Sequence, residues 1–404
     1  MMSKLYALPL FLMLLLSSCH RDDPEPGTMK SRRTVIVYMV AENSLDKYTS
    51  GDLREILVAK DSIPLDCNLV VYLDDSDMPS IYTYSAMTGK SLWKTLPEQD
   101  SCDSLNFRNT LADIVQAFPA EHYGLVMWSH GSGWVPSPRA KQPHRTIGID
   151  NNSGKTHNTG TELEIPVMRR MLEQLGVHWD YIFFDACFMQ CVEVDYELRN
   201  VCDKVLASPA EIPAEGAPYH LIMKSMFEDE DAAEHIARIY HQANVGKTYD
   251  DWGSVIQGGL IISVARSSEM DNLALTMKGF IPGLFAEKRE YEMDGTQFYC
   301  YFNSWSNWKP EYYDLGSAMN LLLSSPSDYQ ALTRQLALTY PVSLQTPFWL
   351  SEFFSKSQGI ITDPNHLAGV SIYLPHSKYD DQDYNNRLHD FQWYKAAGWD
   401  LTGW

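Results

Sequence analysis

The sequence is short of positive charge. Its 32 Lys and Arg residues stand against 52 Asp and Glu residues, which gives a formal net charge of −20. Nucleic-acid binding needs clusters of Lys and Arg that replace the counterions of the phosphates, and no basic cluster occurs along the chain. The composition therefore argues against a nucleic-acid partner and is compatible with the attraction of basic substrates.

Membrane-spanning runs, metal motifs and a disulfide framework are also missing. The apolar stretch from Leu5 to Leu16 has twelve residues, whereas a helix needs about 20 to cross a bilayer. No HExxH motif occurs, and the pair Cys187 and Cys191 is too small a set for a zinc site. The six cysteines after Cys19 have no recognisable spacing. A metal hydrolase is therefore disfavoured.

The first residues are typical of an export signal. Lys4 precedes the apolar stretch, and Leu16-Ser17-Ser18-Cys19 follows it as a small-residue cleavage site. This arrangement resembles a bacterial lipoprotein signal, which predicts removal of residues 1–18 and lipidation of Cys19. An ordinary secretory signal is the alternative. Residues 19–30 are polar and rich in Pro, which predicts a tether. We expect an exported lipoprotein of the outer membrane, held at the cell surface by its lipid anchor.

The apolar pattern predicts an α/β fold with a mostly parallel sheet flanked by helices. Short β-branched runs alternate with stretches of helical spacing. The expected strands are 34–40, 68–73, 123–128, 180–184 and 204–207, and the expected helices are 110–118, 167–175 and 191–200. Two further buried strands are expected at 259–265 and 369–375. We predict a catalytic domain over residues 31–250 and an α/β subdomain over 251–404.

One segment has no apolar period. Residues 136–158 are dense in Pro, Gly, Asn and basic side chains, which predicts a long exposed loop. Loops of this length are usually functional or open to cleavage.

A histidine follows the predicted strand 123–128. The segment Ser129-His130-Gly131-Ser132-Gly133 places an imidazole at the carboxyl edge of the sheet, where α/β proteins hold their ligands. Glycines there allow close backbone approach to a substrate. By itself, such a histidine is more often structural.

A cysteine follows the predicted strand 180–184. Asp185-Ala186-Cys187 comes before a helix that we expect to begin near Met189. A helix N-terminus and a nearby imidazole both favour the thiolate, although an isolated cysteine here is more often an inert core residue. Two strand-end motifs on one parallel sheet can meet as a nucleophile and base. Cys191 is expected to pack in the core.

The ordered motifs resemble the clostripain-like peptidases, whose fold is caspase-like. The resemblance is carried by segment 37–46, by His130-Gly131, by Asp185-Ala186-Cys187 and by segment 369–375. It implies a cysteine endopeptidase with Cys187 as nucleophile and His130 as acid and base. It also implies a thioester acyl-enzyme, and an oxyanion site made by the amides of Gly131 and Cys187.

The resemblance implies cleavage after Arg or Lys in peptide or protein substrates. Asp185 would bind the basic P1 side chain, although a helix-capping role is the alternative. Glu211 and Glu215 are the candidates for a second acidic residue. Relatives cut themselves at a basic residue between the histidine motif and the cysteine motif. In this chain, that region points to Arg145, then to Lys141 and Arg139. The expected form is a monomer, which self-cleavage would convert into two chains.

A different class of function stays open from the sequence. The chain can be a catalytically idle surface lipoprotein that binds glycan or protein, although the aromatic tail over residues 379–404 favours packing. No cofactor is obligatory. Calcium is possible at Asp74-Asp75-Ser76-Asp77, but this run lacks the Gly and distal Glu of the usual loop, so a solvated turn is favoured.

Overall fold

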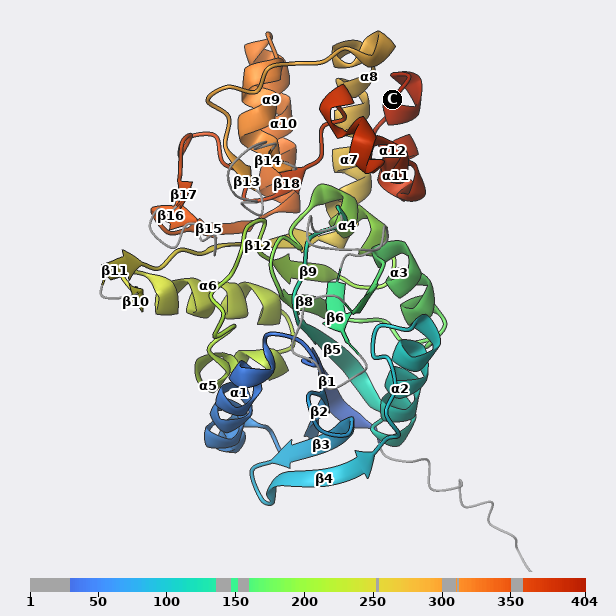
Figure 1. Ribbon diagram of the computed structural model, residues 1–404, viewed down its shortest axis with the longest axis vertical. Coiled ribbons are helices and arrows are strands. Elements are labelled where there is room, and N and C mark those ends of the chain that lie inside the picture. Colours follow the sequence, from blue (N-terminus) through green and yellow to red (C-terminus); the bar gives the residue numbers. More distant parts are fainter. Residues whose placement is uncertain are drawn as a thin grey trace, which may run out of the picture.

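A nine-stranded sheet forms the centre of the computed structural model, which describes residues 30–135, 147–151, 160–251, 254–299, 310, 312–349 and 359–404 (Figure 1). The strand order is β15-β12-β9-β8-β5-β1-β2-β3-β4. The bounds are β1 (Ser31–Val40), β2 (Cys67–Asp74), β3 (Ser80–Ser85), β4 (Gly89–Thr95), β5 (Ala120–Trp128), β8 (Tyr181–Asp185), β9 (Lys204–Ala207), β12 (Ile261–Arg266) and β15 (Val342–Gln345). The five strands from β9 to β2 are parallel to their neighbours, and the strands added at both edges are antiparallel. This confirms the predicted, mostly parallel sheet.

The sequence of β1 explains why helices cover both faces of the sheet. Val35, Val37 and Met39 enter one hydrophobic core, whereas the alternate residues Ile36 and Tyr38 enter the other. Successive side chains of a strand point to opposite faces. Because both sets are apolar and fully buried, each face requires its own layer of helices.

The helices divide between these two cores. On one face lie α1 (Asp46–Val58), α5 (Tyr219–Ile222) and α6 (Ala232–Asn244). On the other lie α2 (Ser104–Ala117), α3 (Ile165–Glu173), α4 (Val192–Leu198), α7 (Met270–Lys278), α8 (Ile281–Leu284), α9 (Leu315–Leu322), α10 (Pro326–Thr339), α11 (Tyr384–Arg387) and α12 (Gln392–Ala396). Among the described residues, no helix has the length and apolar character needed to cross a membrane.

The strands after residue 250 are divided between the central sheet and smaller separate sheets. β12 and β15 extend the central sheet next to β9. A separate small sheet contains β13 (Phe298–Tyr299), β14 (Tyr312–Asp314) and β18 (Ser371–Ile372), and lies among the C-terminal helices in Figure 1. Short pairs are formed by β6 (Ile147–Asp150) with β7 (Thr161–Leu163), β10 (Thr248–Asp251) with β11 (Ser254–Gln257), and β16 (Phe348–Trp349) with β17 (Gly359–Ile360). The domain boundary at residue 250 stays a prediction.

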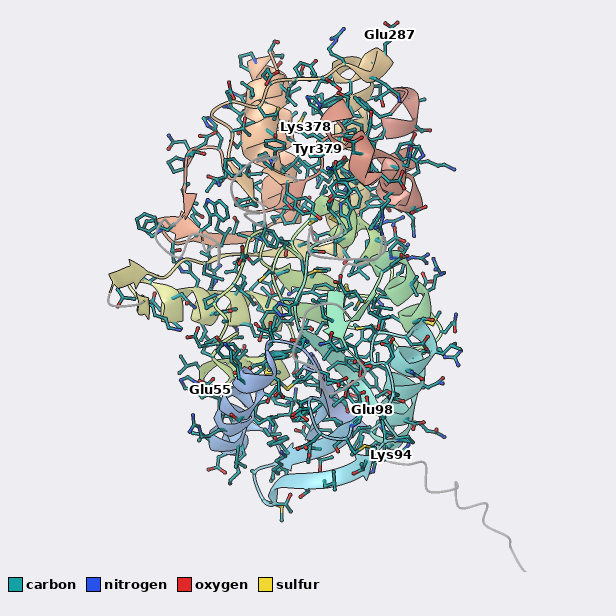
Figure 2. The ribbon with its side chains drawn as sticks, in the orientation of Figure 1. Glu55, Lys94, Glu98, Glu287, Lys378 and Tyr379 are labelled. Carbon is teal, nitrogen blue, oxygen red and sulfur yellow. The ribbon has the colours of Figure 1, made fainter. Side chains whose placement is uncertain are left out.

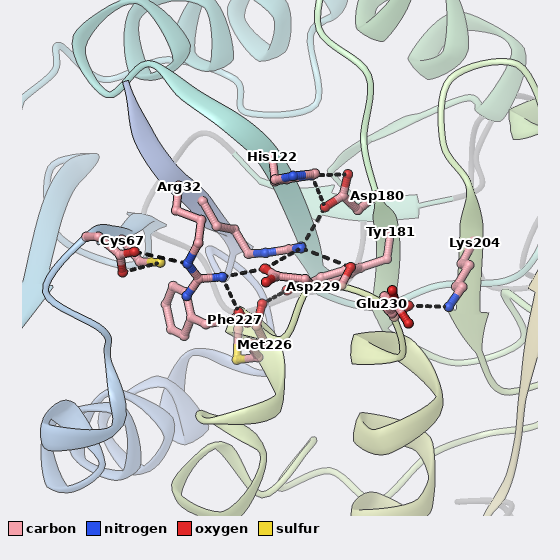
Figure 3. A network of polar contacts seen from close by, with 12 residues as sticks. Arg32, Cys67, His122, Asp180, Tyr181, Lys204, Met226, Phe227, Asp229 and Glu230 are labelled. Carbon is pink, nitrogen blue, oxygen red and sulfur yellow. Dashed lines mark hydrogen bonds and ion pairs between the residues drawn. The ribbon is translucent and has the colours of Figure 1, made fainter. Parts of the chain in front are cut away.

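The amino edge of the parallel strands carries a charged network (Figure 3). Arg33 at the start of β1 is fully buried, and its guanidinium lies 2.7 Å from the Asp180 carboxylate. His122 Nδ1 lies 3.1 Å from the same carboxylate, and Lys204 Nζ donates to Glu230 O over 2.7 Å. Asp180 thus links the amino ends of β1, β5 and β8, and Lys204 at the start of β9 bonds to the loop before α6. The two strand-end motifs lie at the opposite edge.

Candidate active site

The register of β5 and β8 brings the two predicted motifs together. Trp128, the last residue of β5, is paired with Asp185, the last residue of β8. His130 and Cys187 each follow two residues later, so the same register places them side by side beyond the strand ends. Neighbouring strands lie about 4.8 Å apart. The two motifs therefore follow neighbouring strands at the same carboxyl edge, and the pairing of the imidazole with the thiol stays a prediction.

Gly131 lies directly against the nucleophile turn. A Cβ atom at position 131 would come within 2.6 Å of the Cys187 carbonyl oxygen and 3.1 Å of the Ala186 Cβ. Real Cβ atoms do not approach a backbone oxygen so closely, so only glycine fits without movement of the chain. The backbone next to His130 is thus in close contact with the backbone of Cys187.

His130 is held by a serine from a different turn. Ser44 Oγ lies 2.9 Å from His130 Nε2, and Ser44 belongs to the connection between β1 and α1. On the other side of the residue, Gly148 N donates to His130 O over 3.0 Å. Ser44 was not among the predicted site residues, although it lies within the segment 37–46 that resembles the family.

The predicted helix start near Met189 is wrong. Helix α4 begins at Val192, and Cys191 is its N-cap residue. Phe188 adopts a φ of 62°, Phe188 N donates to Ala210 O, and Gln190 N donates to Ser208 O. The left-handed φ of Phe188 is incompatible with a right-handed helix, and these amides bind the segment after β9 instead. Cys187 is therefore not at a helix N-terminus, and Ile212 N donates to its Sγ over 3.4 Å. Cys191 is fully buried, as predicted.

Asp185 is a buried carboxylate that accepts hydrogen bonds from two donors. Ala217 N lies 3.1 Å from both of its oxygens, and Tyr219 Oη donates to Oδ2 over 2.9 Å. Burial raises the pKa of Asp185 to about 6, with a further rise from Glu55 that the hydrogen bonds oppose. The helix-capping alternative is wrong, because α4 begins seven residues later and receives nothing from this side chain.

Glu215 and Glu211 differ in burial and in their neighbours. Gly216 has a φ of +65°, and a Cβ there would come within 2.9 Å of Asp185 Oδ2, so its neighbour Glu215 lies beside Asp185 and is exposed. Glu211 is buried and precedes Ile212, the residue that contacts the Cys187 sulfur.

A second buried acid near Asp185 was not among the predicted site residues. Asp52 of α1 is 4% exposed and accepts a 2.8 Å hydrogen bond from Trp128 Nε1. Burial, followed by repulsion from Asp185, raises the pKa of Asp52 to about 8. In the sequence, the one sign that Asp52 is buried is its position four residues before Ile56, on the same face of the helix.

The model of the clostripain family matches residues 37–404. The chain belongs to the clostripain family. A solved structure of a secreted C11 cysteine protease from Bacteroides thetaiotaomicron, in complex with an irreversible peptide inhibitor, is 28% identical with a TM-score of 0.76. The match covers 91% of this chain and 99% of that chain. An inactive zymogen C11 protease from Parabacteroides distasonis is 25% identical with a TM-score of 0.71, over 91% and 98% of the two chains. No curated protein matches.

This clostripain-family chain is therefore a cysteine peptidase with the α/β fold that its sequence predicts. That result favours the enzyme over the idle lipoprotein. The predicted processing residues Arg139, Lys141 and Arg145, and the predicted lipidation residue Cys19, lie outside the described residues.

In the acidic run at the end of β2, Ser76 and Asp77 are exposed, as the predicted solvated turn requires, but Asp74 is not. Asp74 is fully buried, burial and repulsion by Asp150 raise its pKa to about 9, and it accepts a short hydrogen bond from Ser101 Oγ. Asp75 accepts from Asp77 N over 2.9 Å. Within the described ranges, no group of three or more His, Cys, Asp or Glu side chains could hold a metal ion. Calcium binding at residues 74–77 stays a prediction.

Proposed function

We propose that this clostripain-family peptidase is an endopeptidase that cleaves after Arg or Lys through a dyad of Cys187 and His130. The observation that carries the proposal is the register of β5 with β8, which sets the two residues at equivalent positions past the same sheet edge. The B. thetaiotaomicron relative adds support, since that protease was solved in complex with an irreversible peptide inhibitor.

The chemistry follows from this pair. The Cys187 thiolate attacks the scissile carbonyl carbon, a C–S bond forms, and the carbonyl oxygen becomes an oxyanion. The amides of Gly131 and Cys187 stabilise that charge, and donors of this kind each contribute about 2.7 to 4 kcal/mol. His130 protonates the leaving amine, so the C–N bond breaks and a thioester remains. Water then hydrolyses the thioester, with His130 accepting its proton.

The P1 side chain would bind at Asp185. A buried carboxylate left without a cation is costly, whereas Arg can satisfy it through two parallel hydrogen bonds. We assign Glu215 as the second acidic residue because of its place beside Asp185, and Glu211 as the next candidate.

Reporter peptides ending in Arg, Lys or citrulline test this function. The wild type should cleave the first two and spare the neutral third. Cys187→Ala should abolish cleavage, and Asp185→Asn should reduce kcat/KM for Arg by a factor of at least about 100. The proposal is contradicted if the wild type shows no activity after limited proteolysis within residues 136–158, or if it cleaves the citrulline reporter as fast as the Arg reporter.

We also propose that the peptidase matures by self-cleavage within residues 136–158, first after Arg145 and next after Lys141. The inactive zymogen of the P. distasonis relative supports a latent state. Intact-mass measurement of wild type and Cys187→Ala should show two chains only in the former. Arg145→Gln should shift the cut to Lys141 or Arg139, and an unchanged cut in that variant rules out the assigned position.

We propose export as a lipoprotein from the N-terminal signal, and the secreted B. thetaiotaomicron relative supports export but not the anchor. Mass spectrometry of the mature N-terminus should show an acylated Cys19, and Cys19→Ala should release the protein from the outer membrane. Activity that persists after treatment with EDTA would agree with the prediction that no cofactor is obligatory, whereas its loss and recovery with Ca²⁺ would reverse it.

A further inference from the structure

Asp52 and Asp185 flank one indole on the same face of the sheet. Trp128 donates its Nε1 hydrogen to Asp52 Oδ2 over 2.8 Å, and Trp128 is the register partner of Asp185. Trp128 and Phe183 both belong to the core beneath α1, α5 and α6. Asp185 follows Phe183 by two residues and therefore points to the same face. On α1, Asp52 lies one turn before Ile56, which enters the same core.

The surroundings of Asp52 are rich in negative charge. The ionisable groups around it come from its own helix, β8, the connection before α5, and α5 itself: Glu55, Asp185, Glu215, Tyr219 and His220. His220 Nδ1 lies 2.9 Å from Glu55, which is labelled on α1 in Figure 2. Burial, then repulsion from Asp185, raises the pKa of Asp52 to about 8, against about 6 for Asp185. At neutral pH, Asp185 is thus ionised while Asp52 keeps its proton.

We propose that Asp52 is a specificity-determining residue, which releases its proton to solvent when a cationic P1 side chain binds at Asp185. This inference rests on the proposed function. The bound cation neutralises Asp185, which removes the main repulsion on Asp52 and replaces it with attraction. The O–H bond of the Asp52 carboxyl breaks, the proton passes to buffer, and the site gains a second negative charge. A neutral side chain provides no such gain, so Asp52 sharpens the preference for Arg and Lys.

The coupling has a defined pH signature. Because the bound state holds one proton fewer, affinity for a basic ligand rises with pH until Asp52 is already ionised in the free enzyme. A pKa near 8 in the free enzyme gives an affinity increase of about fivefold from about pH 7 to about pH 8. Asp185 is almost fully ionised over that interval and contributes little.

Butylguanidine, a single-charge copy of the arginine side chain, is the probe, and butylurea is its neutral control. Calorimetry of the mature full chain at about pH 7, in two buffers of different ionisation enthalpy, counts the protons released on binding. The wild type should release close to one proton with butylguanidine and none with butylurea. The inhibition constant of butylguanidine should fall by about fivefold between about pH 7 and about pH 8.

Asp52→Asn keeps an acceptor for the Trp128 indole and removes the titration. In this variant, proton release should fall close to zero and the pH dependence should flatten. Asp61→Asn is the matched control, since the Asp61 side chain is 80% exposed just after α1, and it should behave as wild type. If Asp52→Asn fails to fold, Trp128→Phe removes the hydrogen bond that lowers the pKa of Asp52 and should move the rise to higher pH.

The inference is overturned if the wild type binds butylguanidine without proton release, or if Asp52→Asn releases as many protons as wild type. Failure of the proposed function gives a different result, in which butylguanidine does not inhibit at any pH and Arg and Lys reporters stay intact.

Discussion

At the scale of single residues, we expect the hydrogen bond from Ser44 to help orient the His130 ring. The Ser44 hydroxyl lies 2.9 Å from Nε2. A hydrogen bond of this kind is worth about 0.5 to 1.5 kcal/mol, so Ser44→Ala should lower kcat by about 2- to 12-fold with little change in KM. Ser44→Thr keeps the hydroxyl and should restore most of the rate. Steady-state kinetics on an Arg reporter compare the three proteins, and equal loss in both variants would indicate that Ser44 acts only through packing.

Position 131 has no room for a Cβ atom, and the cost of adding one can be measured separately from the effect of replacing a flexible glycine. Gly131→Ala would press its Cβ against the Cys187 carbonyl oxygen at 2.6 Å, which displaces the proposed oxyanion site. We expect kcat to fall by about 10²-fold, as when an oxyanion donor is lost. Gly51→Ala is the control, because nothing lies within 4 Å of a Cβ in the middle of α1, and alanine there should stabilise the helix by about 0.5 to 1 kcal/mol. Equal activity of the two variants contradicts the steric role.

At the scale of elements, the turn after His130 is hydrogen-bonded to the small C-terminal sheet. Tyr312 of β14 donates its hydroxyl hydrogen to Ser132 O over 2.9 Å and accepts from Trp134 N and Val135 N over 2.9 and 2.8 Å. The ring of Trp134 packs on Tyr373 at 5.0 Å between centroids. The region after residue 250 therefore fixes the position of a motif that precedes it by more than a hundred residues.

Tyr312→Phe should show this coupling. Two buried amides would lose their acceptor, at about 1 to 3 kcal/mol each, so the unfolding temperature and kcat should both fall. Tyr291→Phe also removes one hydroxyl, which donates to Leu284 O over 2.7 Å far from the His130 turn, and should lower stability slightly without affecting kcat. Thermal unfolding and kinetics of both variants test the prediction, which fails if kcat is unchanged in Tyr312→Phe.

At the scale of the whole molecule, buried acids give the stability an unusual pH dependence. Burial is the largest cause of a raised pKa in each case: about 8 for Asp52, 9 for Asp74, 6 for Asp185, 7 for Glu193 and 6 for Asp314. Above about pH 4 the unfolded chain loses these protons while the folded protein keeps them. Raising the pH therefore favours unfolding, up to about pH 9.

We expect the unfolding temperature to be highest near about pH 5 and to fall towards about pH 9. The net charge of −20 acts in the same direction through self-repulsion. Calorimetric scans at constant ionic strength test this dependence. Asp74→Asn should reduce the fall at the alkaline end, because it removes the acid with a pKa of about 9. An unfolding temperature that rises steadily with pH would contradict the prediction.

The sequence by itself determined the parallel core and the two strand-end turns. The five predicted core strands all exist, and Cys187, His130, Gly131 and Asp185 gather at one sheet edge. These features are local, since apolar period, turn residues and strand ends can each be recognised within about ten residues.

The tertiary structure alone decided the partners of those residues. Ser44 contacts His130 from the connection between β1 and α1, and Asp52 contacts Trp128 from a helix. Residues 188–190 pair with residues 208–210, and α4 begins only at Val192. Such contacts join segments that are remote in the chain, and they depend on sheet order and helix packing rather than on neighbouring residues. The raised pKa values arise in the same way, because burial and charge proximity exist only once the layers have assembled.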